Sequence, residues 1–292
     1  MESLIGKKLS ILKNFNSERD KNFLVRAEDG ELLVVKLFGP HTEDAELQVD
    51  TLRRIEGQVS LVPRVVAFGY PILVCTFIEG SVLSDVMSRR EWMIGEAVGR
   101  LARTLANIPC QSRSKPLEWN FSKFNIAIRD LPNEFRKIAD RIGPEIRKVL
   151  SDDARDSWSL CHYDLNDDNI IVQPNGEVGI IDFGDVDSGP RMVDPAICLC
   201  YLLINGLGNQ EKTVIREFLD GYESVVGRLS PEEVHACAVL VVARSLMSLS
   251  IQTRNSSLNP LNYSYLSVSI RGNTEFLRGM NLDEFFKLFL VK

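Results

Sequence analysis

Four residues in the middle of the chain have the types and spacing of a site that transfers phosphoryl groups. His162, Asp164 and Asn169 form the pattern H-x-D-x-x-x-x-N, and Asp182 follows thirteen residues after Asn169. Phosphoryl transfer needs a carboxylate that accepts the proton of the attacking hydroxyl, and oxygen ligands that hold Mg²⁺ beside the phosphates. We therefore predict Asp164 as the catalytic base, and Asn169 and Asp182 as ligands of Mg²⁺.

The stretch CHYDLNDDNIIV, residues 161–172, crowds acidic and amide side chains directly before an apolar run. Like charges at such spacing repel one another, and a divalent cation with a phosphate tail would offset them. The alternative is an acidic surface loop whose Asp and Asn side chains cap turns. His162 is expected to support the loop through hydrogen bonds and not to transfer protons.

A lysine near the N-terminus is the candidate contact for the phosphates. Lys36 alternates with apolar residues in VVKLF, so it is expected to point inward from a strand. Such a lysine needs a polar partner on the following helix. Glu46, Asp44 and Gln48 are the candidates.

Two further segments are expected to contact the nucleotide. The loop SERDKNF, residues 17–23, lies between the first two strands, where Ser17 and backbone amides could donate to phosphate. The segment from Val74 to Gly80 would join the two halves of the chain. Its main chain, at Thr76, Phe77 and Ile78, would hold the base.

The first part of the chain reads as a β-rich unit that would position the lysine. Two β-type runs, 22–27 and 32–38, flank the turn Glu28-Asp29-Gly30 and predict a hairpin. Apolar residues at helical spacing predict a helix over 41–57. Two short β-type runs follow, at 64–69 and 71–80.

The rest of the chain reads as mostly helical, around a few short strands that carry the acidic loop. Helices are expected at 91–108, within 115–157, and from Pro190 to the end. We predict an α+β fold with two lobes. Residues 1–80 would form the nucleotide-binding lobe and hinge, and residues 81–292 the catalytic and substrate-binding lobe, with the ligand between them.

Composition excludes several classes of protein. The net charge of −6 over 292 residues argues against a nucleic-acid partner. The N-terminus lacks the apolar run of a signal peptide, and the apolar stretch 236–251 is interrupted by Arg244 and reads as too short to span a bilayer. No CxxC pair occurs among the six cysteines, which are expected to be buried free thiols. We expect a cytoplasmic protein without membrane association.

At these motifs the sequence resembles the aminoglycoside phosphotransferase and choline kinase superfamily, which has a protein-kinase-like fold. The loop reads HYD and not HRD, no A-P-E segment follows IIDFGD, and Asp194 occupies the D-x-A position of small-molecule kinases. Within the superfamily the chain most resembles the hydroxylysine kinase group. That likeness lies in SERDKNFLV, in LEWNF (117–121) and in IIDFGDVDSG (180–189), within a resemblance that covers nearly the whole chain.

The resemblance implies a kinase that uses Mg²⁺ and ATP or GTP to phosphorylate a small molecule bearing a hydroxyl and an amine. Hydroxylysine is the model acceptor; choline, homoserine, a sugar amine or an aminoglycoside are alternatives, as is a catalytically silent nucleotide-binding module. Asp167, Asp168, Asp185 and Asp187 could hold the ammonium group, and Arg244 could clamp a carboxylate. The alternatives are a turn cap for Asp187 and a structural ion pair for Arg244.

The sequence departs from the superfamily at the partner of the strand lysine. The family has a glutamate there, whereas the matching helix position is Gln48, with Glu46 two residues earlier. The chain is also compact for the hydroxylysine kinase group, so parts of the substrate-binding insert would be reduced. That group is associated with GTP, and the choice between ATP and GTP stays open.

Overall fold

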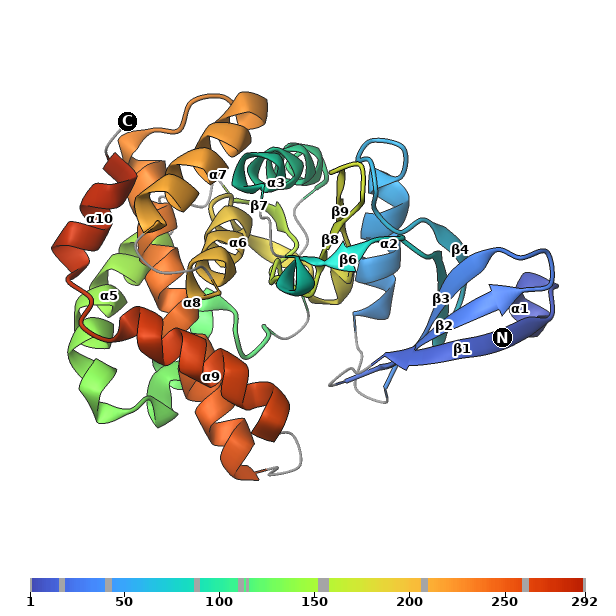
Figure 1. The fold of residues 1–292 in the computed structure, drawn as a ribbon, viewed down its shortest axis with the longest axis horizontal. Coiled ribbons are helices and arrows are strands. Elements are labelled where there is room, and N and C mark those ends of the chain that lie inside the picture. Colours follow the sequence, from blue (N-terminus) through green and yellow to red (C-terminus); the bar gives the residue numbers. More distant parts are fainter. Residues whose placement is uncertain are drawn as a thin grey trace.

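The computed structural model describes residues 2–15, 19–39, 44–86, 90–109, 113, 116–151, 158–205, 210–258 and 263–290. Its N-terminal region is built on a β-sheet and its C-terminal region is mostly helical, which confirms the predicted α+β arrangement (Figure 1). The division of the chain into lobes at residue 80 stays a prediction.

A five-stranded antiparallel sheet forms the N-terminal region, with the strand order β1-β2-β3-β5-β4. Its strands are β1 (Leu9–Phe15), β2 (Lys21–Ala27), β3 (Leu32–Leu37), β4 (Val65–Gly69) and β5 (Ile72–Thr76). The predicted hairpin is β2–β3, and Gly30 in its turn has a φ of 92°, which glycine adopts without a Cβ clash. The run predicted over 71–80 is strand only to Thr76, and residues 77–79 have no regular structure.

Helix α2 (Ala45–Ile55) confirms the helix predicted over 41–57, of which residues 41–43 lie outside the described part. Its buried side includes Gln48, Val49 and Leu52. The helix contacts β4 and the 3₁₀ turn η6 (Phe183–Asp185). It therefore connects the N-terminal sheet to the loop that carries Asp182. A short helix α1 (Glu2–Ile5) precedes β1.

Two small antiparallel sheets fix the loops that carry the predicted site. One sheet pairs β7 (Trp158–Cys161) with β10 (Asp187–Pro190), and the other has the order β6 (Ser81–Val82), β8 (Ile170–Val172), β9 (Val178–Ile180). Loop 162–169 leaves β7 and enters β8, while loop 181–186 leaves β9 and enters β10. Cys161 pairs with Asp187, and Ile170 pairs with Ile180. Both ends of the two loops are thus held side by side.

Helices make up most of the C-terminal region (Figure 1). The longer ones are α3 (Glu91–Leu105), α5 (Arg136–Val149), α6 (Val193–Ile204), α7 (Glu211–Val226), α8 (Pro231–Leu258), α9 (Tyr263–Leu277) and α10 (Leu282–Leu290). Short turns complete the region: η1 (Leu83–Asp85), η2 (Phe121–Lys123), α4 (Phe124–Ala127), η3 (Ile128–Asp130) and η4 (Asn133–Phe135). Within the range 115–157, where one or two helices were predicted, the structure has one long continuous helix, α5, which contains Pro144.

The central helix α8 is longer than its apolar stretch suggested. At 28 residues it is the one helix in the described part of the chain that is long and apolar enough to cross a membrane, so the expectation of a segment too short to span was wrong. However, 89% of the apolar window within Pro231–Ser256 is buried inside the protein, where α8 contacts α5, α6, α9 and α10. These contacts account for its apolar composition.

The prediction of buried free thiols is confirmed for five cysteines. Cys75, Cys161, Cys198, Cys200 and Cys237 are buried and form no disulfide with one another, whereas Cys110 lies outside the described residues. Burial raises the pKa of the Cys75 thiol to about 12, which keeps it protonated.

Candidate active site

The loop after β7 is held in shape by Asp194, which lies in the first turn of α6. Its carboxylate accepts hydrogen bonds from the backbone N–H groups of His162, at 2.8 Å, and Tyr163, at 2.9 Å. The buried His162 ring accepts at Nδ1 from the Asp164 backbone N–H (3.3 Å), so Nε2 donates to the Ile181 carbonyl (3.0 Å). His162 therefore links both loops, in agreement with the expected supporting role.

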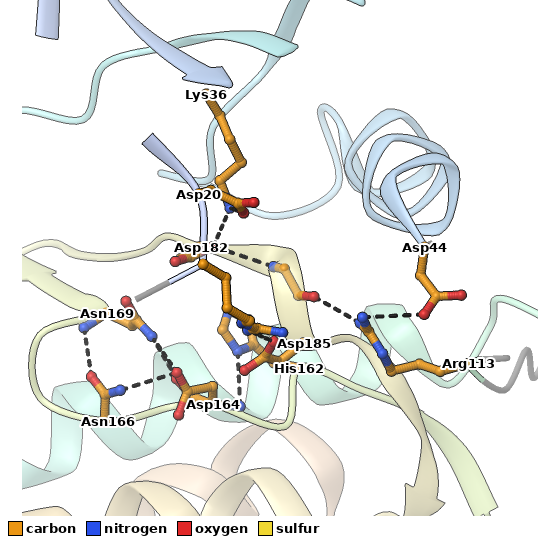
Figure 2. Close-up of polar contacts among 12 residues, drawn as sticks. Asp20, Lys36, Asp44, Arg113, His162, Asp164, Asn166, Asn169, Asp182 and Asp185 are labelled. Carbon is orange, nitrogen blue, oxygen red and sulfur yellow. Dashed lines mark hydrogen bonds and ion pairs between the residues drawn. The ribbon is translucent and has the colours of Figure 1, made fainter. Parts of the chain in front are cut away.

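Asp164 lies at the centre of a polar network (Figure 2). Its Oδ1 accepts from Arg244 Nη2 at 2.8 Å, and its Oδ2 accepts from the side-chain amides of Asn166 and Asn169, each at 3.1 Å. Burial raises the pKa of the Asp164 carboxyl to about 6, and the positive charge of Arg244 limits that rise. A carboxyl group with a pKa near neutrality can both accept and release a proton, as a general base must.

Asn169 and Asp182, the predicted ligands of Mg²⁺, present an amide and a carboxylate from two adjacent loops. Asn169 Nδ2 donates to the Asp164 backbone carbonyl at 2.8 Å, so its amide oxygen points away from that bond. Burial alone would raise the pKa of Asp182, but Lys36 lowers it to about 2, so the carboxylate is ionised. No cluster of three His, Cys, Asp or Glu side chains that could hold a metal occurs among the described residues. Two oxygen ligands fit Mg²⁺, which takes its remaining ligands from phosphates and water.

Lys36 points from β3 toward these loops, as the strand pattern predicts. Its Nζ lies 2.8 Å from Asp182 Oδ1 and 3.5 Å from Asp20 Oδ2, and the residue is only 8% exposed (Figure 2). Burial would lower the pKa of Lys36, but Asp182 and Asp20 raise it above its ordinary value. The ammonium group is therefore charged and faces the Asp182 loop.

The partners proposed for Lys36 on α2 occupy different positions. Glu46 is exposed, whereas Gln48 is buried and its Oε1 lies near Gly184, beside which Lys36 Nζ also lies. Asp44 forms an ion pair with Arg113, at 3.2 Å. Neither Glu46 nor Gln48 has a hydrogen bond or ion pair to Lys36 among the described residues.

Asp20 is the acidic partner of Lys36 that sequence reasoning missed. It also accepts a hydrogen bond from the Gly39 backbone N–H at 3.1 Å. The signal was present in the hairpin register, since Asn22 pairs with Lys36 and the residues just before β2 must lie beside the end of β3. Ser17, the predicted phosphate contact of the same segment, lies outside the described residues.

Asp185, a predicted ammonium contact, already faces a cation. It forms an ion pair with Arg19, and the Arg19 guanidinium lies 5.1 Å from the ring centre of Trp119. Both Arg19 and Trp119 belong to the segments that resemble the hydroxylysine kinase group. A carboxylate and an aromatic face together form an environment in which a cation is stable.

Asp187, the other predicted ammonium contact, is buried and fully engaged. Its carboxylate accepts from the backbone N–H groups of Arg113 (3.1 Å) and Ser188 (2.8 Å) and from the Asn120 amide (2.8 Å). These contacts stabilise the start of β10. The role in substrate binding stays a prediction, and the observed contacts are those of a structural group.

The segment predicted to hold the base lines an open cavity of about 450 Å³. Thr76, Phe77 and Ile78 contribute to it together with Leu32, Leu61 and Gln173. The backbone N–H groups of Thr76 and Phe77 are already bonded to the carbonyls of Arg64 and Leu32. Lys36 and the two polar loops do not line this cavity, so the base-binding role of the three residues stays a prediction.

Comparison of the sequence with known proteins finds phosphotransferases. The phosphotransferase enzyme family matches residues 11–231. Hydroxylysine kinase of Bos taurus is 25% identical over 238 residues, which cover 72% of this chain and 61% of that protein. Hydroxylysine kinase of Danio rerio is 22% identical over 313 residues, covering 93% of this chain and 86% of that protein. The chain thus spans about 61% of the length of the bovine relative.

Solved kinases share the fold. An amicoumacin kinase in complex with AMP-PNP, Ca²⁺ and Ami aligns with a TM-score of 0.69 at 14% identity, over 94% of this chain and 91% of its own. A microcompartment-associated aminopropanol kinase aligns with the same TM-score and identity over 94% of both chains. These similarities confirm the predicted kinase-like fold, and the family match over most of the sequence shows that this chain is a member of the phosphotransferase enzyme family.

Proposed function

We propose that this protein is a small-molecule kinase that transfers the γ-phosphate of ATP or GTP to a hydroxyl of a small amine or amino acid of the hydroxylysine type. The observation that carries the proposal is the meeting of four polar side chains from separate segments. Lys36 lies 2.8 Å from Asp182, and Asn169 lies 3.1 Å from Asp164. The ring of His162 bridges the loops that hold the two pairs.

Each of these residues has a role that its surroundings support. Asp164 accepts the proton of the acceptor hydroxyl, because its raised pKa suits a general base. Lys36 contacts the phosphates of the nucleotide. Asn169 and Asp182 would hold Mg²⁺, which would neutralise charge on the phosphates.

The acceptor class rests on the relatives. The curated proteins that resemble the chain are hydroxylysine kinases, and an aminopropanol kinase is among the solved structures with this fold. Their names suggest a hydroxylated amine as the acceptor. Asp185 would bind the ammonium group by taking it in place of Arg19, with which it is paired.

An acceptor screen tests the proposal. Purified protein is incubated with Mg²⁺, with ATP or GTP, and with hydroxylysine, choline, homoserine, aminopropanol or an aminoglycoside, and products are identified by mass. We expect Asp164→Asn to lower kcat by about 10²- to 10⁴-fold while nucleotide affinity is retained. Asp140→Asn, on the exposed face of α5, is the matched control and keeps full activity.

Two outcomes would count against the proposal. Nucleotide binding without transfer to any acceptor would indicate a silent nucleotide-binding module. Full activity of the Asp164→Asn variant would remove Asp164 from the role of base.

A further inference from the structure

Arg244 lies deep in the protein beside the proposed catalytic base. It is carried by α8, is 4% exposed, and donates from Nη2 to Asp164 Oδ1 at 2.8 Å. The same nitrogen lies 3.4 Å from the Tyr201 hydroxyl, and the guanidinium is 5.6 Å from the centre of that ring. Within the part of the chain that the structure describes, a single nitrogen of Arg244 therefore makes all of its hydrogen bonds.

The other two nitrogens of Arg244 have no acceptor. Nε and Nη1 are buried and lack a hydrogen-bond partner within the described ranges of the chain. Buried N–H donors without acceptors are costly, and those of a charged guanidinium more so. The guanidinium presents five N–H donors in a planar fork, so it can hold a second anion while one edge contacts Asp164.

A structural ion pair with Asp164 explains only part of this arrangement. Asp164 is already oriented by Asn166 and Asn169, which both donate to its other oxygen. The pair also leaves two buried donors of Arg244 unused. These donors belong to the same planar guanidinium whose Nη2 contacts Asp164 Oδ1, so they lie close to the carboxylate that the acceptor hydroxyl has to reach.

We propose that Arg244 binds the carboxylate of the acceptor and thereby selects a hydroxy-amino acid over the corresponding amino alcohol. A carboxylate is planar, carries a full charge and matches the arginine fork. The inference deepens the proposed function and rests on it, because it names the group by which that site recognises its acceptor. Arg244 is thus a specificity-determining residue.

The test compares two acceptors that differ only at this group, 5-hydroxylysine and its α-carboxamide. With wild-type protein we expect kcat/KM for the acid to exceed that for the amide by about 100-fold, since a buried charge pair is lost with the amide. Calorimetry with the two compounds gives the corresponding ratio of dissociation constants, without any requirement for transfer.

The variant Arg244→Met removes the fork and keeps an unbranched side chain. The acid-to-amide ratio of kcat/KM is expected to fall to within about threefold of unity, even if the turnover of both acceptors also decreases. Arg244→Lys, which keeps the charge, should retain an intermediate ratio. The control is Arg254→Met on the same helix, which pairs with Glu118 at 2.5 Å and should leave the ratio unchanged.

Equal affinities and rates of wild-type protein for acid and amide would overturn the inference without the use of any variant. An acid-to-amide ratio that stays unchanged in Arg244→Met would also overturn the inference. It would indicate that Arg244 contacts only the transferred phosphate or Asp164. Failure of the proposed function looks different. In that case no acceptor is phosphorylated, while the calorimetric ratio still reports on Arg244.

Discussion

At the scale of single residues, Lys36 is held by carboxylates on two sides. Asp182 comes from the loop after β9, and Asp20 comes from the residue before β2. In the related superfamily the corresponding partner is a glutamate on the helix. Here the buried helix position is Gln48, an uncharged residue, while Glu46 is exposed. The second negative charge beside Lys36 is thus supplied by a different segment.

We predict that Asp20→Asn weakens the binding of magnesium nucleotide about tenfold, equivalent to about 1.4 kcal/mol. The reason is that Asp20 lies 3.5 Å from Lys36 Nζ and also accepts from the Gly39 backbone, so it orients both the lysine and the end of β3. Calorimetric titration with a non-hydrolysable nucleotide measures the change.

The matched control for this prediction is Glu46→Gln, which also removes one carboxylate near the start of the chain. Because Glu46 is exposed on α2, its substitution should change nucleotide affinity by less than about twofold. A larger loss in Glu46→Gln than in Asp20→Asn would show that the helix, and not the segment before β2, stabilises the lysine.

At the scale of elements, α3 and α7 pack with their backbones in direct contact. A Cβ placed on Gly221 would lie 2.0 Å from the carbonyl oxygen of Trp92, and one on Gly95 would lie 2.0 Å from that of Phe218. These neighbours are backbone atoms and cannot rotate away. The two glycines therefore allow the close approach of the helices.

We predict that Gly221→Ala destabilises the protein by about 3 kcal/mol, because the helices must separate to admit the methyl group. Asp220→Ala is the control: it introduces the same residue at the neighbouring, exposed position and should change stability by less than about 0.5 kcal/mol. Denaturant unfolding followed by circular dichroism measures both. Equal stability of the two variants would mean that α3 and α7 can move apart freely.

Elements with a strong local pattern were predictable from sequence, whereas elements made by pairing were not. The β2–β3 hairpin and the helices after Pro190 follow from alternation, turn residues and helical spacing. Strand β10 has the sequence DSGP, which contains no apolar alternation and is extended only because it pairs with β7. Its existence depends on a partner about thirty residues away.

The same distinction applies to the candidate site. The spacing of His162, Asp164, Asn169 and Asp182 is local information, and these residues lie on two adjacent loops in the structure. The ion pairs that complete the site join distant segments, as Arg19 does with Asp185 and Arg113 with Asp44. No pattern in a single sequence marks such partners, because charged residues are common on any surface.

At the scale of the whole molecule, ion pairs within the described residues join the N-terminal region to segments beyond residue 80. They are Lys36 with Asp182, Arg19 with Asp185, and Asp44 with Arg113. The side chain of Arg113 is 7% exposed and makes two contacts at once, since it also donates to the Gly184 carbonyl at 2.7 Å. One guanidinium thus connects the start of α2 to the Asp182 loop (Figure 2).

We predict that Arg113→Met destabilises the protein by about 3 kcal/mol, because it removes a buried guanidinium that both pairs with the Asp44 carboxylate and donates to the Gly184 carbonyl. The melting temperature should fall by roughly 6 °C. The control is Arg141→Met, whose partner Asp283 is 67% exposed, and which should shift melting by less than about 2 °C. Thermal unfolding at 0.05 M and 0.5 M salt separates the two further, since salt screens the exposed pair and spares the buried one. Similar shifts in both variants would mean that Arg113 does not hold α2 against the Asp182 loop, and that the sheet and the helices stay together through apolar contacts alone.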